Sequence, residues 1–344
     1  MRAQVQRTFG GPEVTAIEDI DDPVPGPDEL LIEVRACALN RLDLLQRRSA
    51  LVRGFSLPHI AGMDVAGVVV GHGPGADPTM LPIGTEVLVD PVSTCGVCHR
   101  CTTGKPAYCD NLRTVGSTRP GGLAEFVAVP AGHVYRIPDG LSFVQAAAIP
   151  VAYLTAWHAL VMVGEVQAGE KVLINAAGSG VSTAAIQFAK QAGAFVIGTI
   201  GGPARVAQAL TLGCDAVVDH YSDDVSDQVH AIVADGVDLV IDHVGTALFT
   251  ASVDAMDVDG RMVFCGTTTG TQATVSLPSL YHWGRRLIGA GGWGPQEFAQ
   301  MLEVVTSARL LPVIDSVWAF SELAEAQARM EAGGCFGKLV VEMA

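Results

Sequence analysis

The sequence predicts an α/β protein of two domains, one rich in β-strands and one built on a doubly wound parallel sheet. The chain has 344 residues, which is more than a single hydrophobic core usually serves. Hydrophobic residues make up 49% of it and charged residues 17%, a balance typical of a compact folded chain. Strands and turns prevail before Lys171, and strands alternate with helices after it.

The first part of the chain is expected to be β-rich. Leu30–Arg35 alternates in polarity as a half-buried strand does, and Val65–Val70 is a run rich in β-branched residues. Glu86–Val89 forms another short strand pattern. Clusters of Gly and Pro between these segments indicate turns rather than helices.

The second part alternates strand and helix patterns of the lengths found in parallel βαβ units. This rhythm predicts a doubly wound parallel sheet. The expected strands are Lys171–Asn175, Phe195–Thr199, Ala216–Asp219, Leu239–Asp242 and Arg261–Gly266, and the expected helices are Val181–Ala192 and Ala204–Leu212.

The pattern breaks at a glycine cluster, Gly289–Gly294, and a terminal segment follows from Gln296 to Ala344. We expect two helices in this segment, with strands at Pro312–Val317 and Lys338–Val341. The segment is predicted to return to the first domain. The predicted β-rich domain therefore comprises residues 1–155 and 292–344, and the dinucleotide-binding domain comprises residues 156–291.

Charge and hydropathy exclude several partners. The formal net charge of −15 disfavours nucleic acid and anionic membranes. The most apolar stretch, Phe143–Val163, contains Gln145, Pro150 and His158, which a lipid-facing helix rarely carries together. It is interpreted as a buried helix near a domain junction. No signal-peptide pattern follows Met1, so we expect a soluble, cytoplasmic protein that acts on a small molecule.

Four cysteines fall within fifteen residues, in the segment 91–112. Cys95, Cys98, Cys101 and Cys109 have the spacing C-x2-C-x2-C-x7-C, which lets four thiolates converge on one tetrahedral Zn²⁺. Because all four ligands are protein thiolates, the spacing predicts one closed, structural zinc site. Two disulfides or an iron–sulfur cluster are the alternatives; the cytosolic context disfavours the former, and nothing else in the chain indicates a redox-partner role.

A glycine-containing turn lies between the first strand and the first helix of the second domain. Gly178 and Gly180 stand where backbone N–H groups and a helix N-terminus hold a pyrophosphate. Ser182 or Thr183 replaces the third glycine of the usual fingerprint, and a serine is still small enough for close packing. The position of the turn at the start of the βαβ units favours dinucleotide binding over a plain tight turn.

The end of the next strand favours NADPH over NADH. The stretch Val196–Arg205 contains no Asp or Glu that would bind the ribose hydroxyls of NAD. Gly201 and Gly202 expose backbone amides there, and Arg205 at the start of the next helix can meet a 2′-phosphate. The alternative is that Arg205 is an ordinary solvated helix residue.

With these sites placed, the chain resembles the medium-chain dehydrogenase/reductase superfamily along nearly its whole length. The resemblance implies a GroES-like β-rich catalytic domain, a Rossmann domain, and a homodimer or homotetramer. The segments that carry it are ALNRLDLLQRR, LPHIAGMDVAGVV, the four-cysteine segment, AAGSGVSTAAIQFAKQAGA, GVDLVIDHVG, GRMVFCGTTTG and GKLVV.

The chain departs from the zinc alcohol dehydrogenases of that superfamily at the catalytic metal. Asn40 and Met63 match the positions of their Cys and His ligands, and the third position falls near Ile149 and Pro150. None of these side chains is a normal catalytic zinc ligand. His59, Asp43 and Asp64 lie near those positions in the sequence and are interpreted as structural residues.

Without a Lewis acid, hydride transfer to an activated C=C or a quinone is favoured over alcohol oxidation, because hydrogen-bond donors suffice to stabilise the enolate. The pattern is similar to that of quinone oxidoreductases and enoyl-thioester reductases, although most quinone oxidoreductases lack the cysteine segment. We therefore expect an NADPH-dependent reductase of a quinone, enone or enoyl thioester. A zinc-type alcohol dehydrogenase and a cofactor-binding protein with little turnover remain alternatives.

The resemblance implies a role for each matched position. Asn40, Arg41, Tyr153 and Thr155 are the expected catalytic and substrate-side residues, with Asn40 donating to the substrate carbonyl. The expected cofactor-binding residues are Gly178, Ser179, Gly180, Val181, Ser182, Thr199, Gly201, Gly202, Arg205, His220, Val244, Cys265, Gly266, Thr267 and Lys338.

Overall fold

The computed structural model describes residues 1–221 and 224–343 of the chain. These residues form two compact units. The first comprises Met1–Val151, Gly294–Ala299 and Ile314–Ala344, and the second comprises Ala152–Trp293 and Gln300–Val313. Compared with the predicted boundaries, residues 152–155, 292–293 and 300–313 fall in the second unit rather than the first.

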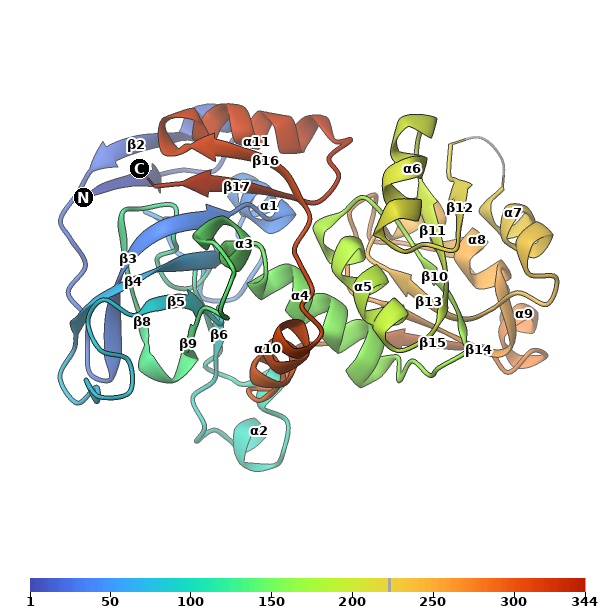
Figure 1. Ribbon diagram of the computed structural model, residues 1–344, viewed down its shortest axis with the longest axis horizontal. Helices are drawn as coiled ribbons and strands as arrows, with labels where there is room; N and C mark the ends of the chain where they lie inside the picture. The colour runs from blue at the N-terminus through green and yellow to red at the C-terminus, as the bar shows by residue number, and fades with distance from the viewer. Residues whose placement is uncertain (222–223, 344) are drawn as a thin grey trace. The chain divides into compact units, whose positions relative to one another are not determined.

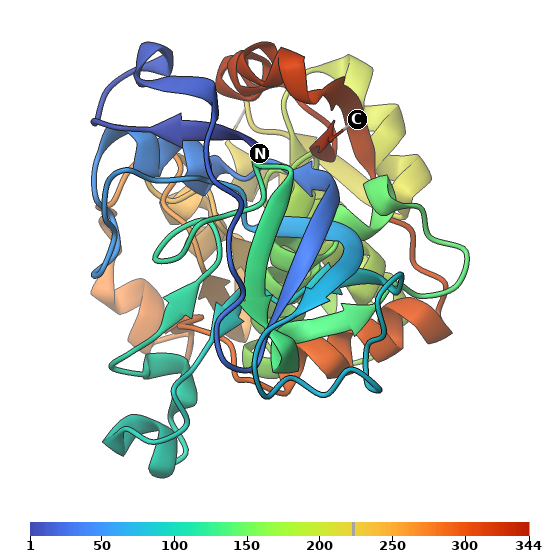
Figure 2. The same ribbon diagram turned by 90° about the vertical axis from the view of Figure 1, so that its left-hand side faces the viewer.

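The first unit is built on a seven-stranded sheet in the order β16-β17-β3-β4-β5-β9, with β8 also pairing with β3. Two two-stranded antiparallel sheets, β1-β2 and β6-β7, accompany it, and both chain termini lie in this unit (Figure 2). Its strands are β1 (Arg2–Gln6), β2 (Thr15–Asp19), β3 (Glu29–Ala38), β4 (Asp64–His72), β5 (Glu86–Val89), β6 (Val92–Ser93), β7 (Arg113–Thr114), β8 (Phe126–Pro130), β9 (Val134–Arg136), β16 (Ile314–Ala319) and β17 (Lys338–Glu342).

The core of the first unit arises from alternation along these strands. In β3 the residues Leu30, Ile32 and Val34 are each at most 1% exposed, because successive side chains point to opposite faces of a strand. They pack with Val65, Val87 and other β-branched residues in one hydrophobic cluster. The helices of this unit are α1 (Arg41–Arg48), α2 (His99–Thr102), α3 (Phe143–Ala147) and α11 (Leu323–Ala332).

The second unit is built on a six-stranded parallel sheet in the order β12-β11-β10-β13-β14-β15. The chain starts in the middle at β10, runs to one edge and then returns to fill the other half. The strand order therefore reverses between β10 and β13, where doubly wound sheets bind ligands at the carboxyl ends of their strands. The strands are β10 (Lys171–Ile174), β11 (Phe195–Ile200), β12 (Ala216–Asp219), β13 (Val237–Asp242), β14 (Met256–Phe264) and β15 (Arg286–Gly289).

Helices cover both faces of this sheet. Figure 1 shows α5 and α6 on one face and α7 and α8 on the other, as right-handed crossovers require when the order reverses. The helices that belong to this unit alone are α5 (Gly180–Gln191), α6 (Pro203–Leu212), α7 (Val225–Ile232), α8 (Thr246–Asp254) and α9 (Leu277–Tyr281). Two more helices, α4 (Pro150–Trp157) and α10 (Glu297–Ser307), begin in residues of the first unit and continue in residues of the second.

The structure confirms the predicted fold class, a β-rich unit beside a doubly wound parallel sheet. The apolar stretch Phe143–Val163 differs from the prediction, because it is not one helix. It forms α3, then α4, then a π-helical segment η4 (His158–Val163). Pro150, which lacks an N–H donor, stands at the first position of α4 and explains the break.

No helix among residues 1–221 and 224–343 is long and apolar enough to span a lipid bilayer.

Candidate functional site

The four cysteines of the segment 91–112, which we call the cysteine lobe, converge in space. Their sulfur atoms all lie within 4.8 Å of one another. Sγ of Cys109 is 3.4 Å from Sγ of Cys95, and Sγ of Cys98 is 3.5 Å from Sγ of Cys101 and 3.9 Å from Sγ of Cys109. Four sulfurs around a tetrahedral zinc are about 3.8 Å apart, since each Zn–S bond is about 2.3 Å. Figure 2 shows this lobe projecting from the strands of the first unit.

Backbone N–H groups surround the sulfurs of the cysteine lobe. Cys98 donates to Sγ of Cys95 over 3.4 Å, and Cys95 and Asn111 donate to Sγ of Cys109 over 3.3 Å each. N–H bonds from Val97 and Cys98 lower the pKa of Cys95 to about 6. Such donors stabilise thiolates, which are the form that binds zinc. The cysteine lobe therefore fits one structural Zn²⁺, while His99 is exposed and lies outside the ligand group.

The phosphate-binding turn joins β10 to α5 and has the cap expected of an anion site. Ser179 is the N-cap of α5, and its hydroxyl accepts a hydrogen bond from the Ser182 N–H over 3.0 Å. Ser182 is completely buried, as predicted for the position of the third glycine. Thr199 of β11 is also fully buried, and its hydroxyl accepts from the Ala176 N–H over 2.9 Å. Thr199 therefore holds the turn in place from the neighbouring strand.

A polar network that the sequence analysis did not identify supports this turn from β13. The Asn175 amide donates over 2.8 Å both to Asp242 Oδ1 and to the hydroxyl of Ser252. Asp242 also accepts N–H bonds from Val244 and Gly245. Asn175, Asp242 and Ser252 are each 0% exposed. The sequence could have indicated this network, because it places polar residues at the carboxyl ends of two parallel strands, and such ends meet at one edge of the sheet.

The carboxyl ends of β11 and β12 bring together the residues predicted to meet the adenosine. Arg205, in the first turn of α6, donates to the carbonyl of Gly201. A Cβ at Gly201 would lie 2.0 Å from the ring of Tyr221 and 2.8 Å from Nε2 of His220, so a side chain there would displace one of these rings. Gly202 has a φ of +86°, which favours glycine. Nδ1 of His220 is buried without a hydrogen-bond partner among the described residues, and burial lowers the pKa of this imidazole.

The remaining predicted cofactor residues of the second unit follow β13 and β14. Val244 is buried and Thr267 is exposed. Gly266 lies so close to the backbone of His243 that a Cβ would be 2.6 Å from its carbonyl oxygen. Burial raises the pKa of the Cys265 thiol to about 12, so this thiol is neutral near pH 7. These residues cluster at the same edge of the sheet as the phosphate-binding turn.

In the first unit, Asn40, which matches the position of one catalytic metal ligand, belongs to a largely buried hydrogen-bond network. Nζ of Lys338 donates over 2.8 Å to each of three oxygens: the Leu39 carbonyl, Asn40 Oδ1 and Asp64 Oδ2. Asn40 Nδ2 donates to the same Asp64 oxygen over 2.9 Å, and the Val151 N–H donates to the other over 2.7 Å. We call these residues the Asn40 network.

The predicted cofactor contact of Lys338 does not agree with this geometry. An ammonium has three N–H donors, and all three are used inside the first unit. Lys338 is 6% exposed and Asp64 is 0% exposed, so the ion pair is buried. Lys338 therefore orients Asn40 and Asp64, and β17 places it there by pairing with β3.

The other potential metal ligands near this network also have partners. Asp43 Oδ2 accepts from the Asn40 N–H over 2.7 Å, and Oδ1 accepts from the Gly62 N–H over 3.3 Å. Burial raises the pKa of Asp43 to about 6. His59 is hydrogen-bonded through Nε2 to the carbonyl of Gly116 over 3.1 Å. These residues are structural, as the sequence analysis interpreted them, and Arg41 is exposed at the start of α1.

Tyr153 and Thr155 of α4 lie in different environments. Tyr153 is 1% exposed, its hydroxyl accepts from Gln187 over 2.9 Å, and its ring packs edge-on against Phe188. Burial raises the pKa of this phenol well above its usual value. Tyr153 is thus a core residue of the second unit, and this position does not support its predicted role in lining a pocket. Thr155 is partly exposed.

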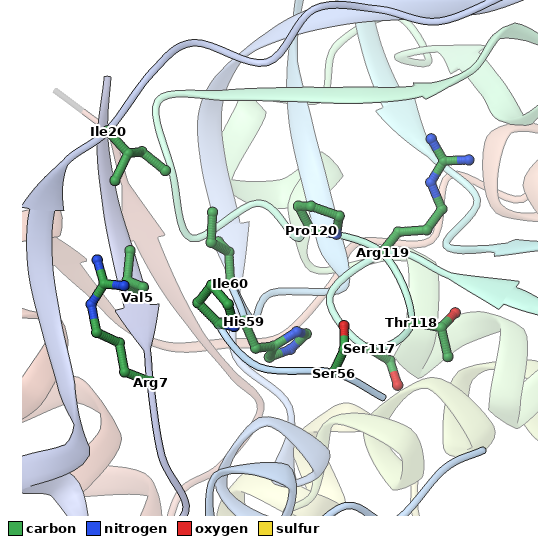
Figure 3. Close-up of a pocket in the computed structure, with 11 residues that line it drawn as sticks. Val5, Arg7, Ile20, Ser56, His59, Ile60, Ser117, Thr118, Arg119 and Pro120 are labelled. Carbon is green, nitrogen blue, oxygen red and sulfur yellow. The ribbon is translucent and has the colours of Figure 1, made fainter. Parts of the chain in front are cut away.

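A hollow of about 200 Å³ lies in the first unit, apart from the residues predicted for the site (Figure 3). His59 lies in its lining with its ring bonded to Gly116, as described above. Arg7 and Arg119, which also line it, pair with Glu18 and Glu29. The charged groups of this hollow are therefore engaged within the protein.

A cysteine lobe shaped for zinc and a phosphate-binding turn on a doubly wound sheet define a dinucleotide-dependent oxidoreductase. Comparisons with known proteins agree. A family model described as "Alcohol dehydrogenase GroES-like domain" matches residues 26–139, and one described as "Zinc-binding dehydrogenase" matches residues 180–307.

Relatives with two different named activities match the chain. An NAD-dependent alcohol dehydrogenase of Sulfolobus acidocaldarius is 29% identical over 100% of both chains. A quinone oxidoreductase of Mus musculus is 32% identical, over 77% of this chain and 73% of that protein. A solved structure of an NAD-dependent alcohol dehydrogenase has a TM-score of 0.94 at 36% identity, covering 100% of both chains.

The chain belongs to the medium-chain dehydrogenase/reductase superfamily. Its first unit is the GroES-like domain, its second is the Rossmann-like domain, and it is an NAD(P)H-dependent oxidoreductase.

Proposed function

We propose that the protein is an NADPH-dependent reductase of an activated C=C or a quinone, and that it works without a catalytic zinc. The Asn40 network is the observation that carries this proposal. Asn40 stands where zinc alcohol dehydrogenases have a Cys ligand, and its amide is hydrogen-bonded to the Lys338 ammonium and to the Asp64 carboxylate. Met63 stands at the matched His position. An amide and a thioether are not normal catalytic zinc ligands, and the buried Lys338 ammonium adds a positive charge beside them.

The network leaves one donor for a substrate. Asn40 Oδ1 accepts from Lys338, and one Nδ2 hydrogen is donated to Asp64. The second Nδ2 hydrogen is therefore left for another acceptor. Asn40 is partly exposed, so a ligand can reach this hydrogen. We propose that it donates to the substrate oxygen on which negative charge develops when hydride adds to a conjugated carbonyl or a quinone. Alcohol oxidation would instead need a Lewis acid to favour the alkoxide.

The second unit supports dinucleotide binding, with NADPH proposed over NADH. When bound, NADPH supplies the hydride. Residues 178–182 of the phosphate-binding turn would hold the pyrophosphate at the N-terminus of α5. Arg205, the glycine pair before it and His220 would hold the 2′-phosphate, since β11 ends without a carboxylate. Thr155 is proposed to contact the nicotinamide carboxamide.

The assembly is proposed to be a homodimer or a homotetramer with one structural zinc per chain. β15 is an edge strand of the six-stranded sheet, and exposed apolar side chains lie close to it in sequence. Tyr281 is 68% exposed and Trp283 is 51% exposed. Pairing of two such edges would cover both. Light scattering of the purified protein measures the number of chains.

The test combines substrate turnover with metal analysis. Purified protein is assayed for oxidation of NADPH, and of NADH in parallel, with a simple quinone, an enone and an enoyl thioester. Oxidation of primary and secondary alcohols with NADP⁺ and NAD⁺ is measured beside them. We expect NADPH oxidation with an activated acceptor and one zinc per chain. Two zinc ions per chain with alcohol oxidation would support the zinc alcohol dehydrogenase instead, and dinucleotide binding with no turnover at all would support a cofactor-binding protein.

A matched variant tests the choice of dinucleotide. Arg205→Ala removes the guanidinium. It should raise the Kd of NADPH by tenfold or more, which is about 1.4 kcal/mol, while the Kd of NADH changes little. Arg309→Ala, in the same unit, serves as the control. A wild-type enzyme that prefers NADH would contradict the proposed role of Arg205.

A further inference from the structure

His243 lies at the carboxyl end of β13, against the two serines of the phosphate-binding turn. Its Nε2 is 2.9 Å from the hydroxyl oxygen of Ser179 and 2.8 Å from that of Ser182. Neither the glycine fingerprint nor the sequence analysis assigned this histidine a role. Three polar side chains from two strand ends therefore meet where a dinucleotide pyrophosphate is proposed to bind.

The hydrogen-bond geometry fixes the tautomer of His243. The Ser182 hydroxyl donates its single hydrogen to the Asn175 carbonyl over 2.6 Å. Ser182 can therefore only accept from His243, so Nε2 must carry a hydrogen. The opposite assignment would place two lone pairs against each other at 2.6 or 2.8 Å. Burial lowers the pKa of His243, which agrees with a neutral imidazole near pH 7.

This tautomer determines what Ser179 can do. Its hydroxyl oxygen accepts the Ser182 N–H, and it shares the single Nε2 hydrogen of His243 with the Ser182 hydroxyl oxygen. Its own hydrogen cannot go to Nε2, which is a donor, so that hydrogen is left for another acceptor. Ser179 is partly exposed at the N-terminus of α5, where an anionic oxygen is the favoured acceptor.

The surroundings hold the imidazole in this position. Gly266 leaves no room beside it, since a Cβ there would lie 3.0 Å from the His243 Cβ. The hydroxyl of Thr268 donates to the His243 carbonyl over 3.1 Å. The ring is therefore fixed from the loop after β14 and from the turn after β10.

We propose that His243 is a positioning residue of the dinucleotide site. Its Nε2–H group turns the Ser179 hydroxyl into a donor to a phosphate oxygen of the pyrophosphate. The proposal rests on the proposed function for the identity of the ligand. It adds a residue that reaches the cofactor through Ser179 rather than by direct contact.

A double-mutant cycle tests this coupling. Ser179→Ala and His243→Leu are each expected to raise the Kd of NADPH by about fivefold to fiftyfold, the range for a charge-assisted hydrogen bond. The double variant is expected to bind within about twofold of the weaker single variant, because both changes remove the same donor. Kd is measured by titrating NADPH fluorescence, with NADH run in parallel.

Conservative variants separate positioning from folding. The amide nitrogen of glutamine reaches about the place of Nε2, whereas that of asparagine is one bond shorter. His243→Gln should therefore keep most of the affinity, and His243→Asn should lose it. The KM for the second substrate should stay constant in all these variants while the KM for NADPH rises. His282→Leu, an exposed histidine of the same unit, is the control.

The outcomes distinguish this inference from the proposed function. A His243→Leu protein with wild-type affinity, or multiplicative effects in the double variant, would overturn the inference alone. If His243→Leu does not fold, equal affinities of the Gln and Asn variants would overturn it instead. A wild-type protein that binds neither NADPH nor NADH would overturn the proposed function and this inference together.

Discussion

The cysteine lobe and the Asn40 network both include a position that matches a metal ligand in zinc alcohol dehydrogenases, and the two regions differ in the charge around that position. In the cysteine lobe, four sulfurs lie within 4.8 Å of one another, which suits one cation between them. In the Asn40 network, the Lys338 ammonium already supplies a cation, 2.8 Å from Asp64. The cysteine lobe gathers ligands for a cation, whereas the Asn40 network pairs its carboxylate with a cation from its own chain.

The comparison teaches that a metal site depends on the charges already present as much as on residue type. Asp64 and Asp43 are buried carboxylates and would suit a cation in composition. The Lys338 ammonium is already paired with Asp64, and both oxygens of Asp43 accept N–H bonds. The sulfurs of the cysteine lobe accept only weak N–H bonds, so a metal gains the full ligand set there.

Removing one thiolate of the cysteine lobe is expected to have the largest effect. Cys95→Ser should lower bound zinc from one per chain to nearly none and should unfold the lobe, because structural zinc binding supplies folding free energy. We expect a fall in Tm of about 5 °C or more. Metal content is measured by mass spectrometry and Tm by calorimetry. Retention of zinc by this variant would contradict the site, and His99→Ala should keep both values.

The second prediction breaks the Asn40 network. Lys338→Met leaves Asp64 buried without its cation, which is expected to cost about 3–5 kcal/mol in the free energy of unfolding. Lys190→Met is the matched control, since the Lys190–Asp215 pair is about one-third exposed and should contribute about 0–1 kcal/mol. Urea unfolding measures both. If both variants lose the same free energy of unfolding, the buried Lys338–Asp64 pair does not stabilise the fold more than the exposed pair does.

The third prediction concerns Asn40 itself. Asn40→Ala removes the proposed donor to the substrate oxygen while leaving Lys338 paired with Asp64. We expect kcat to fall about 100-fold, or about 2.7 kcal/mol, with the KM for NADPH unchanged. Steady-state kinetics with a quinone measure both constants. If kcat stays at the wild-type value, Asn40 is not the donor.

The sequence predicted most of the fold, because local patterns specify it. The polarity pattern predicted strands at Glu86–Val89 and Ala216–Asp219, and both have these bounds in the structure. The helix after the phosphate-binding turn was placed one residue from its observed start at Gly180. The edge strand β15, Arg286–Gly289, was not predicted, since its four residues include an exposed Arg and little alternation.

The site was less predictable, because its partners meet only in three dimensions. The cysteine lobe follows from spacing within fifteen residues. Lys338 reaches Asn40 from 298 positions away, and His243 reaches Ser179 from 64 positions away. Pattern and spacing predict neither pair. The hydrogen bonds of the buried Lys338 ammonium can be seen only in the folded chain. They are the reason why Lys338 is no longer interpreted as a cofactor contact.

The smallest expected effect compares the two buried carboxylates beside Asn40. Asp64 has a lysine partner, whereas Asp43 accepts only from N–H groups, and burial raises the pKa of Asp43 from 3.8 to about 6. A raised pKa means that the folded protein holds the proton more tightly than the unfolded chain. Its contribution to stability is therefore fully present below about pH 4 and is lost as the pH rises to about 6.

Asp43→Asn cannot titrate and should remove this slope. Between pH 4.5 and pH 6.5, the free energy of unfolding of the wild type should fall relative to that of the variant by on the order of 1–2 kcal/mol. Urea unfolding at several pH values in this range measures the difference, and Asp259→Asn, in the other unit, serves as a control. Parallel curves for the wild type and Asp43→Asn would show that the N–H bonds from Asn40 and Gly62 compensate for the burial of Asp43, in which case both carboxylates are equally satisfied.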